Sequence, residues 1–177
     1  QIDEAIVLLG SLKEPLKNLE SYHRNFAITL YSNHDYKSAL HELSLAKKYT
    51  SDPKLFRMAG QCYIKMSQYV MAYKEFKIES EMTPTIFAPR YYLMKTALKA
   101  NNISLATNTA QGILDLKPKI NSDKVIFYKN QAAVLLKSFG IKSPKNITKI
   151  KSPSSLKKLQ TASFSKLIEH PKSTTKW

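Results

Sequence analysis

The chain has 177 residues and a formal net charge of +15 at pH 7, which fits one domain of ordinary size with an appendage. Its 28 lysines and arginines, against 13 acidic residues, predict attraction to acidic partners such as nucleic acid, anionic lipid or acidic protein. A single cysteine excludes an internal disulfide, while few glycines and no alternating apolar segment between hairpin turns disfavour a strand-rich fold.

Residues 1–19 carry an apolar stripe at helical spacing that is interrupted at Pro15. Proline is poorly tolerated inside a helix, so the stripe is short. We interpret this segment as the remnant helix of a preceding repeat. The stripe consists of Ile2, Ala5, Ile6, Leu9 and Leu12.

Three alanines recur at a nearly fixed period within residues 20–140. Ala39, Ala72 and Ala106 are 33 and 34 residues apart. This period resembles that of the tetratricopeptide repeat (TPR), in which each repeat is a pair of antiparallel helices. We therefore expect three stacked helical hairpins in this part of the chain.

The first repeat, about residues 20–52, is divergent. His23 stands in place of the first large residue of the pattern, and Asp35 is predicted to cap the second helix after a polar turn. The positions that fit the repeat are Phe26, Ala27, Leu30, Ala39, Leu43 and Ala46.

Residues 53–84 give the clearest repeat, because large, small, glycine, tyrosine, alanine, phenylalanine and proline follow one another in the TPR order. Glycine inside a helix costs about 1 kcal/mol relative to alanine. The presence of Gly60 therefore predicts that the second helix passes too close for a side chain. The matching residues are Phe56, Ala59, Gly60, Tyr63, Ala72, Phe76 and Pro84.

The third repeat, about residues 87–118, is in phase with the others and has Asn101-Asn102 as its turn. After it, an apolar stripe between Ser122, a predicted N-cap, and Gly140, a predicted stop, indicates the capping helix that a solenoid needs. The sequence thus predicts an all-α fold, a TPR-type α-solenoid of antiparallel helical hairpins with a C-terminal capping helix over residues 20–140.

Residues 141–177 form a basic tail rich in serine, proline and lysine, with nine lysines against Glu169 as the one acidic residue. Such a segment buries too little apolar surface to offset the entropy of ordering it. The tail is predicted to be flexible.

A longer string in the third repeat and cap supports a more specific resemblance. From about Tyr22 to Leu136 the chain resembles the extracytoplasmic TPR region of O-antigen ligase and polymerase family proteins from Bacteroidetes. The string comprises Pro89-Arg90-Tyr91-Tyr92-Leu93-Met94, then Ala106, Ala110 and Ile113-Leu114, then Lys119-Ile120, Ser122 and Val125.

The resemblance implies a module attached to a membrane glycosyltransferase that acts on lipid-linked glycans, at the periplasmic face of the inner membrane. No apolar run in this chain approaches the roughly 18 residues of a membrane-spanning helix, and no catalytic residue of that family can be carried over. The implied function of the segment is non-catalytic protein interaction in surface polysaccharide assembly.

Aligning the repeats predicts a concave groove that is cationic with aromatic inserts. Such a groove suits an acidic peptide or protein, or a phosphorylated glycan carrier, because lysine and arginine bind these anions by charge-assisted hydrogen bonds. A merely solvated face remains the alternative. The groove residues are Arg24 and Tyr31, then Lys54, Arg57, Gln61 and Lys65, then Tyr91, Lys95 and Lys99.

A chaperone-type carboxylate clamp is disfavoured, because TPR domains of that kind are expected to carry asparagine where this chain has Ile28 and Gln61. Catalysis and cofactors are not expected either. Cys62 is interpreted as a packed hydrophobe, and Glu79 and Glu81 as solvated carboxylates at a helix end. The histidines lack the spacing of a metal site: they are His23, His34, His41 and His170.

Two other functions remain open. The chain is alternatively a stand-alone TPR adaptor that binds an acidic peptide or protein through the basic groove. A nucleic-acid tether is the third possibility, because the lysines of the tail would engage phosphates with a steep salt dependence.

Overall fold

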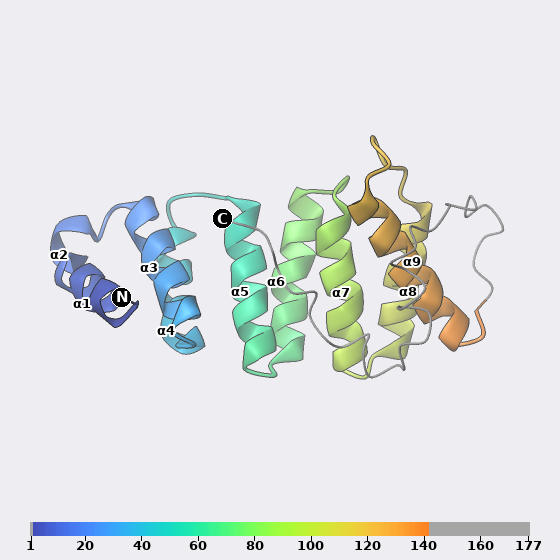
Figure 1. The fold of residues 1–177 in the computed structure, drawn as a ribbon, viewed down its shortest axis with the longest axis horizontal. Helices are drawn as coiled ribbons and strands as arrows, with labels where there is room; N and C mark the ends of the chain where they lie inside the picture. Colours follow the sequence, from blue (N-terminus) through green and yellow to red (C-terminus); the bar gives the residue numbers. More distant parts are fainter. Residues whose placement is uncertain (1, 142–177) are drawn as a thin grey trace.

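The computed structural model describes residues 2–141, and every regular element within them is a helix (Figure 1). The predictions for Gln1 and for residues 142–177, which include nearly all of the basic tail, lie outside this range. The helices are α1 (Ile2–Ser11), α2 (Lys13–Leu16), α3 (Glu20–Ser32), α4 (Tyr36–Ala46), α5 (Pro53–Lys65), α6 (Tyr69–Met82), α7 (Phe87–Lys99), α8 (Ile103–Asp115) and α9 (Asp123–Ser138).

Helices α3 to α8 form three consecutive hairpins: α3 with α4, α5 with α6, and α7 with α8. Neighbouring hairpins pack through α4 and α5 and through α6 and α7, and α9 packs against both α7 and α8. Figure 1 shows the hairpins side by side along the long axis, with α1 and α2 at one end and α9 at the other. The predicted all-α TPR-type solenoid with its capping helix is confirmed. We call α3, α5 and α7 the first helices of their hairpins.

The turn inside each hairpin repeats one backbone conformation. His34, Ser67 and Asn101 have left-handed φ angles of 65°, 60° and 57°. The amide after each of them bonds back to the first helix, as in a Schellman helix end. These bonds run from Asp35 to the carbonyl of Leu30 (2.9 Å), from Gln68 to that of Tyr63 (2.8 Å) and from Asn102 to that of Ala97 (2.9 Å).

Side-chain caps begin the helices where the sequence predicts them. Asp35 accepts a hydrogen bond from the amide of Ser38 at 3.0 Å, and Ser122 accepts one from that of Val125 at 3.4 Å. Each such bond satisfies an amide at a helix start that has no partner within the helix. The predicted capping roles of Asp35 and Ser122 are confirmed.

Small residues let the helices of each hairpin approach closely. Ala39, Ala72 and Ala106 are all fully buried. A Cβ added to Gly60 would lie 2.7–2.9 Å from ring atoms of Phe76, so the close approach predicted for Gly60 is correct, and the group that approaches is the Phe76 ring. This ring is fully buried and stacks on Tyr92 of the next hairpin with centroids 5.0 Å apart. Gly60 therefore makes room for the side chain that joins hairpins two and three.

Candidate partner-binding site

The nine predicted groove residues all lie on the first helices, but they differ in exposure. Lys54 and Lys65 of α5 are exposed, whereas Tyr91 and Lys95 of α7 are buried. The others are half-buried: Arg24 and Tyr31 on α3, Arg57 and Gln61 on α5, and Lys99 on α7. The surface is thus not uniform, and the contacts of each cation decide whether it is available to a partner.

Both arginines are neutralised within the protein. Arg24 bonds through Nε to Glu20 Oε1 at 2.6 Å and through Nη2 to Asp52 Oδ2 at 3.1 Å. Arg57 bonds through Nε to Glu79 Oε1 at 2.6 Å. These ion pairs hold α3 to the start of α5 and α5 to α6. Arg24 and Arg57 therefore serve packing within the solenoid rather than offering free positive charge.

Glu79 corrects a prediction from the sequence. It was expected on a solvated helix end, but its side chain is fully buried, because it continues the buried face of α6 that includes Ala72 and Phe76. Burial raises the pKa of Glu79, and the hydrogen bond and charge of Arg57 oppose that rise. Its Oε2 atom has no hydrogen-bond partner.

This burial predicts a pH dependence. Because the pKa of Glu79 is higher in the folded state than in the unfolded state, its contribution to stability is complete below the unfolded pKa and is lost as pH rises through the folded pKa. Urea unfolding of wild type and Glu79→Gln from pH 4 to pH 7 should show the wild type losing stability relative to the variant as pH rises. Parallel pH profiles would contradict this expectation.

Tyrosines of α7 and α9 form a cluster, which we call the tyrosine cluster and define as Tyr91, Tyr92 and Tyr128. The Tyr91 ring centroid lies 5.0 Å from that of Tyr128 and 5.9 Å from that of Tyr92. Burial raises the pKa values of Tyr91 and Tyr128. Arg57 of α5 opposes the rise at Tyr128, so its guanidinium lies within electrostatic range of that hydroxyl.

Tyr31 of α3 also lies within electrostatic range of this cluster. Burial raises its pKa to about 12, and charge on Cys62, Tyr36 and Tyr92 adds to the effect. Tyr92 belongs to α7, so the pKa of a side chain on α3 is influenced by one on α7.

Lys95 is the one predicted cation that is buried beside the cluster. Its Nζ lies 5.6 Å from the centroid of the Tyr91 ring. Burial lowers its pKa to about 8, and the charge of Lys99 adds to the lowering. No carboxylate of residues 2–141 pairs with Lys95. Lys99 itself lies 5.5 Å from the Tyr69 ring of α6.

Sequence reasoning missed Tyr92, Phe127 and Tyr128. It treated residues 121–140 only as a cap, although α9 packs on α7 as the next first helix would. Phe127 contacts the Tyr91 ring at a centroid distance of 5.6 Å. An alignment of the start of α9 with the earlier first helices could have identified Phe127 and Tyr128 as candidate surface residues.

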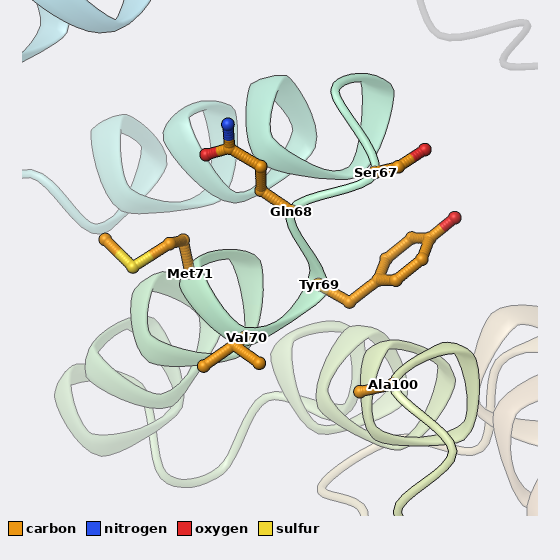
Figure 2. A pocket seen from close by; sticks show the side chains of 6 residues that line it. All are labelled: Ser67, Gln68, Tyr69, Val70, Met71 and Ala100. Atoms are coloured by element: carbon orange, nitrogen blue, oxygen red, sulfur yellow. The ribbon is translucent and has the colours of Figure 1, made fainter.

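A separate hollow of about 320 Å³ lies near the turn between α5 and α6 (Figure 2). Figure 2 shows Val70, Met71 and Ala100 presenting apolar atoms around it, with the Tyr69 ring at one side. None of the predicted groove residues lines it, and it has no acid, base or cation. The lining residues are Ser67, Gln68, Tyr69, Val70, Met71 and Ala100.

Other chemistry is limited in the described part of the chain. Cys62 is fully buried, and burial raises its pKa to about 12, so its interpretation as a packed residue is confirmed. Within residues 2–141, no group of three acidic, histidine or cysteine side chains is placed to hold a metal ion. None of the described helices combines the length and hydropathy needed to cross a bilayer.

Comparison with known proteins agrees with the fold. No protein-family model and no curated protein matches the sequence. The solved structure described as "MamA MSR-1 C2" has a TM-score of 0.58 at 18% identity and covers 78% of each chain. The structure described as "MamA RS-1 ArsTM double mutant" has a TM-score of 0.59 at 17% identity and covers 78% of this chain and 86% of the other. These structures are TPR-like helical repeats, and at such identities the likeness shows the fold alone.

Proposed function

We propose that this chain is a non-catalytic protein-interaction module that binds an acidic peptide or protein segment along its first helices. TPR-type solenoids present an extended concave surface to partners. The proposal depends on the observation that some cations of this surface are paired with carboxylates and others are not. Arg24 and Arg57 are occupied by carboxylates, whereas the lysines of the same helices have no ion pair within residues 2–141. These lysines are Lys54, Lys65, Lys95 and Lys99.

Charge reversal of unpaired lysines on the first helices tests this proposal without touching the buried ion pairs. A variant with Lys54→Glu, Lys65→Glu and Lys99→Glu is expected to bind a fluorescein-labelled oligoglutamate peptide at least about tenfold more weakly than wild type, as measured by anisotropy at low salt. Arg57→Glu is unsuitable, because it would place a second carboxylate against Glu79.

The matched control changes three exposed lysines outside the first helices and has the same net charge. It carries Lys37→Glu, Lys48→Glu and Lys74→Glu. This control should keep most of the affinity if the partner lies on the first helices. Equal weakening of the two variants, or no binding of oligoglutamate to wild type, would refute the proposal.

A narrower proposal is that the module belongs to an O-antigen ligase-like membrane glycosyltransferase and lies at the periplasmic face of the inner membrane. It is supported by the string from Pro89 to Val125. Much of that string also has a packing role, since Pro89, Tyr91, Leu93 and Met94 are buried. Sequencing the gene upstream of Gln1 tests it: several long apolar spans would support the proposal, and a nearby start codon would refute it.

A further inference from the structure

We propose that Lys95 and the tyrosine cluster form an anchor for one side-chain carboxylate of the bound acidic segment. This inference rests on the proposed function and names one point of contact within it. Lys95 is 9% exposed, its ammonium lies 5.6 Å from the centroid of the Tyr91 ring, and the Tyr91 ring contacts those of Tyr92 and Tyr128. The site therefore combines contributions from α7 and α9.

The first argument is the missing counterion of Lys95. Other buried charged groups of residues 2–141 have partners: Glu42 faces His23 at 2.7 Å, and Glu79 binds Arg57. Lys95 has neither a carboxylate nor a hydrogen-bond acceptor in that range. A largely buried lysine loses part of its hydration, and an incoming anion would compensate for that loss. Binding of a carboxylate would complete the pair that the free protein lacks.

The second argument is the set of hydrogen-bond donors in the tyrosine cluster. The hydroxyls of Tyr91, Tyr92 and Tyr128 form no hydrogen bond within residues 2–141, and a phenol hydroxyl donates well to a carboxylate. The buried carboxylate of Glu79 is already held by Arg57. The cluster thus offers donors to an anion without a competing internal acceptor.

The third argument concerns the charge of the ligand. One ammonium and one carboxylate form a neutral pair, whereas a phosphate dianion would leave negative charge among aromatic rings. Lys99 does not supply the second cation directly, because its ammonium lies over Tyr69. The further lysines Lys54 and Lys65 lie on α5, so repeated side-chain carboxylates along a segment fit better than one chain terminus.

Lys95 gives the anchor a pH signature. A bound carboxylate favours the ammonium form, so affinity should fall as pH rises past the free-state pKa of about 8. The groups that act on Lys95 are Lys99, whose charge lowers its pKa, and Tyr91, whose ring lies beside its ammonium. Burial raises the pKa values of Tyr91 and Tyr128, which keeps these two hydroxyls neutral between pH 7 and pH 9.

The test compares Lys95→Gln with Lys74→Gln, which removes the same charge from an exposed position on α6. The probe is a fluorescein-labelled oligoglutamate peptide with an amidated C-terminus, and oligoglutamine with a free carboxyl terminus is the second arm. We expect Lys95→Gln to bind oligoglutamate at least about tenfold more weakly at pH 7 and to lose the pH dependence seen in wild type. Lys74→Gln should stay within about twofold of wild type.

Each outcome separates the two proposals. If wild type and Lys95→Gln bind oligoglutamate equally, the anchor is refuted and the interaction module stands. If wild type binds neither peptide, the proposed function fails and the anchor fails with it. Binding of the free-acid glutamine peptide alone would refute the assignment to side-chain carboxylates.

A stability measurement without ligand distinguishes a binding role of Lys95 from a purely structural one. Removal of an unpaired buried charge should not destabilise the fold, so Lys95→Met is expected to unfold at the same or a higher urea concentration than wild type. A lower midpoint for Lys95→Met would mean that the lysine serves packing, and it would overturn the anchor.

Discussion

A His23→Leu variant is expected to unfold with a free energy about 3–5 kcal/mol below that of wild type, because it leaves a buried carboxylate without its partner. His23 and Glu42 are both nearly inaccessible to solvent, and His23 Nδ1 lies 2.7 Å from Glu42 Oε2. The other ring nitrogen, Nε2, lies 2.8 Å from the carbonyl oxygen of Lys17. His23 thus ties α3 to α4 and to the segment that precedes α3. Urea unfolding monitored by circular dichroism measures the loss.

Two further variants separate the pair from simple packing. Glu42→Gln keeps a hydrogen-bonding partner for His23 and should cost clearly less than His23→Leu. Replacing both residues, His23→Leu with Glu42→Leu, removes both polar groups and should recover part of the loss. If the double variant loses as much unfolding free energy as His23→Leu and Glu42→Leu lose separately when added together, the two side chains are not coupled.

A Phe76→Ala variant is expected to lose about 3–5 kcal/mol of unfolding free energy, as large-to-small changes of buried aromatic residues do. The Phe76 ring is fully buried, lies against Gly60 of its own hairpin and stacks on Tyr92 of the next. Its loss removes contacts both within hairpin two and between hairpins two and three. Thermal and urea unfolding should both report the change.

Gly60 provides the test of this packing. Gly60→Val should destabilise wild type by about 1–3 kcal/mol, because the new side chain would meet the Phe76 ring. In the Phe76→Ala background the same valine enters the vacated space and should raise the stability. If Gly60→Val is equally harmful in both backgrounds, the close contact with Phe76 is not what restricts residue 60.

Local signals in the sequence were sufficient for the hairpins. The alanines at Ala39, Ala72 and Ala106 mark close helix contacts, and Asp35 and Ser122 mark helix starts, because a cap acts on an amide two or three residues away. Gly60 was also informative, since glycine in a helix has a cost that close packing must offset. The fold class followed from these residues together with their repeat period.

The state of the basic surface was not available from the same signals. The sequence placed Arg24, Arg57 and Lys95 together as groove cations, and it gave no sign that the first two are paired and the third is not. Arg57 pairs with Glu79 on α6, the second helix of its hairpin, and Glu79 lies on the buried face of that helix. Such a contact depends on the direction in which each side chain points between the two helices. The number of charged residues in the sequence does not predict that direction.

By itself the sequence determined the helices, their caps and the repeat that stacks them, because all three depend on residues close in the chain or at one fixed spacing. Only the tertiary structure decided which charges remain free and which side chains meet. The Tyr128 ring of α9 contacts the Tyr91 ring of α7, and Tyr92 of α7 influences the pKa of Tyr31 on α3, because separate helices stack together. Burial and pairing are properties of that stacking, so the environment of Lys95 emerges only when the hairpins are assembled.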